Sequence, residues 1–206
     1  LIEAVNQYPE AGIFCPKIYF YDKPDTLLFA GSDWHSGKAI FIDRGEDQKD
    51  TGVYDESRET EFAAGAALFF KREVAEKVGL FDTRFFLIWE EVDWCSRARK
   101  LGYRIRVTAK GKVWHKRTQS FPGGRFGFVA QYFYHRNRLL WIEKNLHGME
   151  KWRAYKKCLK DFLHWHRVLK QLPPGDSERA CLQGRIQGSL DYVRRIFGPC
   201  PYEKLV

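Results

Sequence analysis

Residues 85–94 read FFLIWEEVDW, an apolar approach that ends in three carboxylates, Glu90, Glu91 and Asp93. Apolar residues then recur at helical spacing, which predicts a helix over residues 90–101. The carboxylates lie in its first turn, at the positive end of the helix dipole. Acids in this position also suit an ordinary surface helix with structural ion pairs, but a tryptophan on each side favours a partly dry carboxylate cluster.

Strand and helix patterns alternate on both sides of this helix. We expect an α/β unit over residues 1–120, followed by a basic helical extension over residues 121–206. The individual expectations are a helix end over 1–8, strands over 12–20 and 61–70, a long ordered loop with short strands over 21–61, a helix over 71–78, two short strands over 103–109 and 112–116 around a turn at Lys110 and Gly111, and helices over 128–146, 150–172 and 177–197.

Composition excludes several classes of protein. The chain has 206 residues, 44% of them hydrophobic and 16% aromatic, which is too much apolar surface for a disordered segment. No apolar run is long enough to cross a bilayer, and the first residues lack the pattern of a signal peptide. Five scattered cysteines argue against a disulfide framework and a zinc knuckle, so a reducing compartment is expected.

Positive charge is concentrated in one region. Residues 110–172 hold 15 Lys or Arg against 3 Asp or Glu, within a chain of net charge +9. Aromatic residues interleave with these bases, as in a helix that lies on an anionic membrane, although a helical bundle with its bases outside fits equally well. A nucleic-acid-binding module would also tolerate this charge, but no nucleic-acid motif is present and the acids of residues 82–93 would repel phosphate. We expect no nucleic-acid partner.

Histidines give a weak signal by themselves. His115 lies in KVWHKR, where strand alternation places it on the same face as Val113. The other five histidines form no pair at the four-residue spacing of a helix-borne zinc site, so a dedicated zinc site is not expected.

A longer stretch carries a family resemblance. Residues 65–115, GAALFFKREVAEKVGLFDTRFFLIWEEVDWCSRARKLGYRIRVTAKGKVWH, are similar to the second half of the catalytic domain of family 2 glycosyltransferases with the GT-A fold, especially bacterial rhamnosyltransferase-like and galactofuranosyltransferase-like enzymes. The similarity extends over most of residues 10–146. It implies a partial GT-A fold that lacks its N-terminal nucleotide-binding half and is followed by C-terminal helices.

Catalytic roles follow from the same resemblance. It makes Glu91 the general base that takes a proton from an acceptor hydroxyl in an inverting transfer. The family usually has Asp there, and the longer Glu keeps Asp93 as a substitute. His115, 24 residues after Glu91, matches a histidine that helps to bind a divalent metal, and Trp89 with Glu90 would line the acceptor site.

Further contacts and partners are implied in the same way. Lys116 and Arg117 would add charge at the diphosphate or at an acceptor phosphate, unless they are simply solvated bases, and Gly65 and Ala66 would lie near the donor. The Asp-x-Asp motif that supplies most ligands for manganese or magnesium is absent, so this fragment is expected to be inactive alone. The implied partners are a nucleotide-diphosphate sugar and a glycan or lipid-linked acceptor.

Location and class complete the expectations. The resemblance implies a bacterial enzyme of cell-wall polysaccharide biosynthesis, in the cytoplasm or at the inner face of the cytoplasmic membrane, with peripheral membrane contact through residues 110–172. The alternative is a non-catalytic basic domain that binds a membrane or a nucleic acid.

Overall fold

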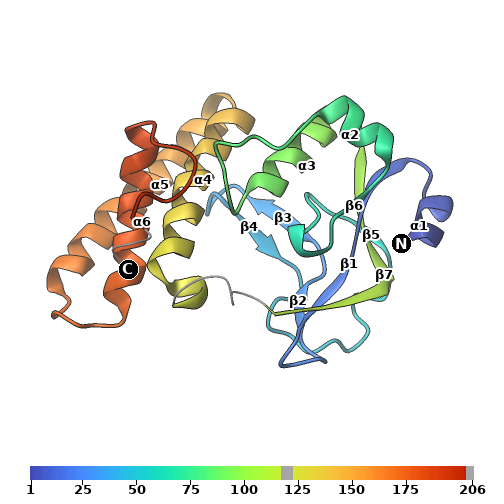
Figure 1. Ribbon diagram of the computed structural model, residues 1–206, viewed down its shortest axis with the longest axis horizontal. Helices are drawn as coiled ribbons and strands as arrows, with labels where there is room; N and C mark the ends of the chain where they lie inside the picture. The colour runs from blue at the N-terminus through green and yellow to red at the C-terminus, as the bar shows by residue number, and fades with distance from the viewer. Residues whose placement is uncertain (117–122, 203–206) are drawn as a thin grey trace. The chain divides into compact units, whose positions relative to one another are not determined.

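The computed structural model describes residues 1–116 and 123–202, and it has the expected α/β architecture (Figure 1). A mixed five-stranded sheet and six α-helices make up its described part. In chain order the elements are α1 (Ile2–Gln7), β1 (Ala11–Phe20), β2 (Leu27–Phe29), β3 (Ser32–His35), β4 (Ile40–Asp43), β5 (Arg58–Glu59), the 3-10 turn η1 (Gly65–Ala67), β6 (Phe69–Phe70), α2 (Arg72–Val78), α3 (Glu90–Lys100), β7 (Arg104–His115), the 3-10 turn η2 (Gly124–Phe126), α4 (Phe128–Asn145), α5 (Gly148–Gln171) and α6 (Glu178–Val193).

The chain forms two compact units. The first contains Leu1–His35, Phe41–Phe81 and Glu91–Arg117, and it holds the sheet and helices α1 to α3. The second contains Ser36–Ile40, Asp82–Glu90 and Thr118–Val206, and it holds helices α4 to α6.

Strand β1 is the centre of the main sheet. It pairs in parallel with β7 along one side and antiparallel with β2 and β6 on the other, and β5 continues the sheet beyond β7. Nine of its ten residues are buried, as expected for a strand with neighbours on both sides. Strands β3 and β4 form a separate two-stranded sheet.

The strand expected over residues 61–70 is mostly absent. Ala64 to Ala67 form a tight turn, with the Ala67 N–H donating to the Ala64 carbonyl at 3.0 Å, and only β6 pairs with β1. Alanine and glycine have low strand propensity, and the run lacks β-branched residues to hold it extended. The apolar run therefore packs as a turn.

The two strands expected around Lys110 and Gly111 are one strand, β7. Its pairing with β1 steps from Pro16 opposite Thr108 to Lys17 opposite Lys112, so the intervening residues form a bulge. A Cβ on Gly111 would lie 2.9 Å from the Pro16 Cβ. Gly111 thus allows β7 to approach β1 closely and does not mark a reversal of the chain.

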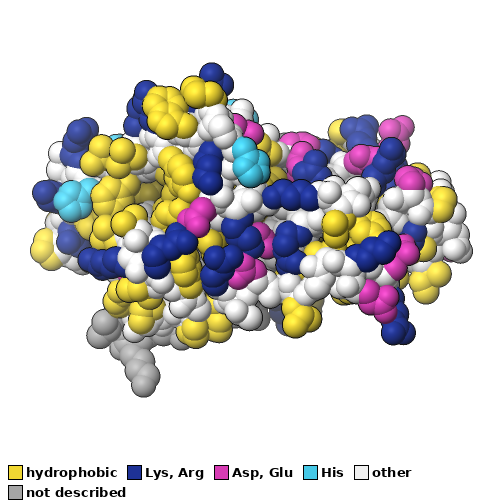
Figure 2. All heavy atoms as spheres, turned by 90° about the horizontal axis from the view of Figure 1, so that it is seen from above, with side chains coloured by type: hydrophobic (Ala, Val, Ile, Leu, Met, Phe, Trp, Pro, Cys, Tyr) yellow, Lys and Arg dark blue, Asp and Glu magenta, His cyan; other side chains and the backbone are white. Residues whose placement is uncertain are grey.

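Helix α4 is the core of the second unit. Thirteen of its residues are buried, including Tyr132, Phe133 and Leu140. Helix α6 can approach α4 closely because Gly184 and Gly188 have no side chains. A Cβ on either glycine would lie only 2.3 Å or 2.2 Å from an α4 carbonyl oxygen. On the face drawn in Figure 2, Lys and Arg side chains alternate with hydrophobic ones over the C-terminal helices.

The described helices include no candidate membrane span. Within 1–116 and 123–202, every helix is too short or too polar to cross a bilayer.

Candidate active site

The first turn of α3 places Glu91 beside the turn η1. A Cβ built on Gly65 would lie 3.5 Å from Glu91 Oε1, while Gly65 itself and Ala66 are exposed. The other oxygen, Glu91 Oε2, is buried. Gly65 therefore places no side chain beside Glu91 Oε1.

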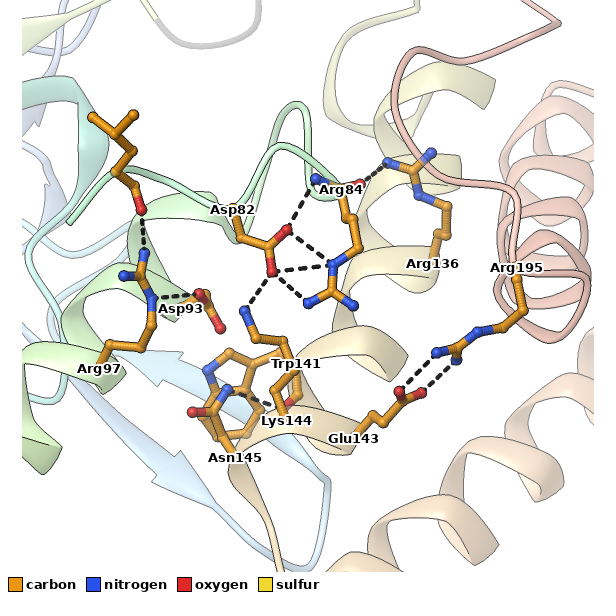
Figure 3. Close-up of polar contacts among 11 residues, drawn as sticks. Asp82, Arg84, Asp93, Arg97, Arg136, Trp141, Glu143, Lys144, Asn145 and Arg195 are labelled. Atoms are coloured by element: carbon orange, nitrogen blue, oxygen red, sulfur yellow. Dashed lines mark hydrogen bonds and ion pairs between the residues drawn. The ribbon is translucent and has the colours of Figure 1, made fainter. Parts of the chain in front are cut away.

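Asp93 has a different environment. It is fully buried and pairs with Arg97 one turn later, with Oδ2 3.0 Å from Arg97 Nε (Figure 3). The same guanidinium donates to the carbonyls of Val78 and Leu80 at 2.6 and 2.7 Å. Asp93 thus fixes the end of α2 through Arg97, and it has no access to a substrate hydroxyl.

Glu90 begins α3. Burial raises the pKa of its carboxyl above the ordinary value. Within the described part of the chain, its buried Oε2 has no hydrogen-bond partner. A buried carboxyl in this condition holds its proton more tightly than a solvated one, so Glu90 is a second candidate for proton transfer.

Trp89 does not line an open surface. Its side chain is only 4% exposed and packs edge-on against Tyr134 and at a tilt against Trp141, both on α4. Its φ of 77° is left-handed, as are those of Phe86 and Ile88 at 62° and 65°. Three non-glycine residues in this conformation store strain that the surrounding structure must hold.

Helix α4 supplies the groups that hold this strained segment. The Asn137 amide donates to the carbonyls of Phe85, Leu87 and Ile88 at 2.8, 2.8 and 2.6 Å. The Arg136 guanidinium donates to the Phe85 carbonyl at 2.9 Å and the Arg84 carbonyl at 3.2 Å. Arg136 and Asn137 are fully buried, so these bonds are shielded from water.

Sequence reasoning assigned no role to these two residues. They belong to His135, Arg136, Asn137 and Arg138, four consecutive polar residues in an apolar helix, and all four are buried. Four consecutive positions cover every side of a helix, so some had to face the core and find partners there. Four consecutive polar residues in an otherwise apolar helix were therefore the sequence signal that could have identified Arg136 and Asn137.

An ion-pair cluster fixes the start of the same segment. Asp82 accepts from Arg84, whose Nη2 lies 2.6 Å away, and from Lys144 of α4, whose Nζ also lies 2.6 Å away (Figure 3). Arg84, and then Lys144, hold the pKa of the Asp82 carboxyl well below its ordinary value. Asp82 is therefore a structural anion.

His115 is the last residue of β7. It pairs with Phe20 of β1, its carbonyl accepts from the Tyr21 N–H at 3.2 Å, and its side chain is half-buried. Exposed Lys116 lies over the Tyr21 ring, 4.5 Å from its centroid. Arg117 lies outside the described residues.

Glu91 and His115 come from different elements of the first unit. Glu91 lies in the first turn of α3, one turn before Cys95, and His115 ends β7 opposite Phe20 of β1.

Among the described residues, no three His, Cys, Asp or Glu side chains are grouped to hold a metal.

Comparison with known proteins adds no family assignment. The chain matches no protein-family model and no curated protein.

Proposed function

We propose that the chain is the acceptor-side part of an inverting, metal-dependent glycosyltransferase with the GT-A fold. The observation that carries the proposal is the position of Glu91, whose carboxylate lies against exposed Gly65 in the first turn of α3. Parallel α/β sheets bind their ligands outside the carboxyl ends of the strands. Because Gly102 and its neighbours reverse the chain between α3 and β7, the first turn of α3 lies toward that edge.

The proposed reaction is a single displacement. An acceptor hydroxyl oxygen bonds to the anomeric carbon of the donor sugar as the bond from that carbon to the diphosphate oxygen breaks. Glu91 takes the hydroxyl proton, and the nucleoside diphosphate leaves with the electron pair of the broken bond. The carboxylate must lie within hydrogen-bond reach of the hydroxyl, and the lack of a side chain at Gly65, beside Glu91 Oε1, is proposed to leave room for it.

The other groups support this step. His115, the last residue of β7, is proposed to face the diphosphate. A bound manganese or magnesium ion would neutralise the leaving diphosphate. Lys116 is exposed beside it and can contribute positive charge there.

Buried Trp89 is proposed to have a structural role rather than to contact the acceptor. Its packing against two α4 aromatics fixes the residue that directly precedes Glu90. The acceptor class proposed is a glycan or a lipid-linked glycan.

The proposal is tested with the full-length protein and a panel of uridine- and thymidine-diphosphate sugars. We expect one donor to be turned over with manganese, measured as released nucleoside diphosphate, and EDTA to abolish that release. Gly65→Val places methyl groups beside Glu91 Oε1 and should block transfer to an acceptor without unfolding the chain. Absence of turnover with every donor in the panel would refute the proposal.

A further inference from the structure

Helix α5 has one face that is fixed in the interior of its unit. Trp165 is buried in a cluster with Leu182 and Ile186 of α6, and Ala154 is also buried. These contacts set the rotation of the helix about its axis. The opposite face of α5 is therefore held toward solvent.

That outward face is apolar at four positions. Met149, Trp152, Leu159 and Leu163 are 62%, 55%, 58% and 55% exposed. Together with Lys156, His166 and Lys170 they recur at alternating three- and four-residue intervals, which places them in one line along the helix. We call these seven residues the α5 stripe.

Positive charge surrounds the apolar positions. Arg153, Lys160 and Arg167 lie beside the stripe and are exposed. The acids of α5 lie on other sides of the helix: Asp161 pairs with Lys157 and lies 3.7 Å from Arg138, and Glu150 lies in the first turn. The exposed face of α5 is consequently both apolar and cationic.

Trp152 and Lys156 are paired within the stripe. The Lys156 ammonium lies over the Trp152 ring, 4.8 Å from its centroid. Tryptophan and lysine both have an apolar body and a polar end, so they suit the boundary between hydrocarbon and lipid headgroups. A cation at this position would meet lipid phosphate while the ring enters the headgroup layer.

We propose that the α5 stripe docks this chain on an anionic membrane surface. The charge favours that occupant over a second copy of the chain, because pairing two copies through this face would bring two sets of cations, including Lys156, Lys160 and Lys170, close together. An anionic bilayer offers the complementary charge and accepts the leucines.

The structure narrows the membrane contact expected over residues 110–172. Helix α4 carries aromatics and bases of similar composition, but its aromatics and even Arg136 and Arg138 are buried. Of the two long helices α4 and α5, only α5 combines exposed large apolar residues with exposed bases. The inference is independent of the role of Glu91, since docking needs no chemistry at that residue.

The test measures co-sedimentation of the full-length protein with phosphatidylcholine vesicles, with and without phosphatidylglycerol. We expect binding only when phosphatidylglycerol is present. Leu159→Ser with Leu163→Ser should lower the partition coefficient about 30-fold by removing inserted apolar surface. Lys156→Glu with Lys160→Glu should lower it about 100-fold through lost and reversed charge.

Matched controls separate the stripe from general surface effects. Leu80→Ser changes a leucine that is 91% exposed in the other unit. Lys23→Glu with Lys110→Glu makes the same charge change at two exposed lysines. Both controls should bind as the unaltered protein does.

Several outcomes would overturn the inference. Equal binding to neutral vesicles, or unchanged binding of the Lys156 and Lys160 variant, would remove the electrostatic argument. A dimer in solution that Leu159→Ser with Leu163→Ser dissociates would assign the stripe to a second copy. If Leu159→Ser with Leu163→Ser fails to fold, Lys156→Glu with Lys160→Glu tests the membrane contact by itself. Both lysines are exposed, so this variant is expected to fold.

Discussion

Replacement of Asn137 by leucine tests how the segment before α3 is held. The Asn137 amide donates to three buried carbonyls, those of Phe85, Leu87 and Ile88. Its own oxygen accepts from Arg136 Nε at 3.0 Å. Leucine has nearly the same size, so the change removes these bonds without opening a large cavity.

The expected cost can be worked from these contacts. An amide has two N–H donors, so its three contacts are worth about two full hydrogen bonds, or about 2 kcal/mol. Buried carbonyls and one Arg136 N–H lose their partner, which adds about 2 kcal/mol more. The sum of about 4 kcal/mol corresponds to a fall in melting temperature of about 8–16 °C for a chain of this size.

Asn145→Leu is the matched control on the same helix. Its amide donates to the Trp141 carbonyl of its own turn at 3.1 Å, so its loss should cost less than about 1 kcal/mol. Thermal unfolding followed by circular dichroism measures both variants, and hydrogen exchange of residues 86–90 should accelerate only in Asn137→Leu. Melting temperatures of the two variants within about 3 °C of each other, less than about 1.5 kcal/mol, would refute the reasoning.

Three further predictions concern packing and pH. Gly188→Ala places a methyl group 2.2 Å from the Tyr132 carbonyl oxygen and should cost about 3 kcal/mol in a urea titration, whereas a loss under about 1 kcal/mol would show that α6 can shift. Hydrogen bonding to Arg195 lowers the pKa of Glu143 from 4.5 to about 2, so the folded state binds this proton less readily than the unfolded state. Its stabilisation is present above about pH 4.5 and is lost toward about pH 2, and Glu143→Gln should flatten this acid dependence. Burial raises the pKa of Glu90, so its ionisation opposes folding, and Glu90→Gln should raise the melting temperature more at about pH 8 than at about pH 4; an equal effect at both would contradict the pKa shift.

The elements with strong periodicity could be predicted from the sequence. Helices α3 to α6 were expected within a few residues of their observed ends, and Gly102 has the left-handed φ of 89° that its position after α3 requires. Alternation along 112–116 correctly placed Val113 and His115 on the less exposed side of β7. These features depend on local spacing, which a sequence displays directly.

The two failures have different causes. The apolar run of residues 61–70 lacks β-branched residues and turns locally at η1, although its composition resembles a buried strand. Gly111 looked like a turn but lies where β7 bulges against Pro16, so the deciding contact there comes from a residue distant in the sequence.

The candidate site was predictable only in part. The carboxylates at the start of α3 were identified, and the structural ion pair expected as the alternative forms between Asp93 and Arg97. The position of Glu91 beside Gly65 was not expected. The burial of Trp89 against α4 could not be read from its neighbours. Arg136 and Asn137 were missed because their partners are backbone carbonyls some 50 residues earlier.

Turnover of the full-length Glu91→Gln protein, measured beside donor affinity and beside Glu90→Gln, puts the proposed base to the most direct test. The account predicts that Glu91→Gln lowers the rate of transfer about 10²- to 10⁴-fold while the donor dissociation constant stays the same. Glu90→Gln should retain most of the activity. Full turnover in Glu91→Gln, or a large loss confined to Glu90→Gln, would contradict the assignment of Glu91.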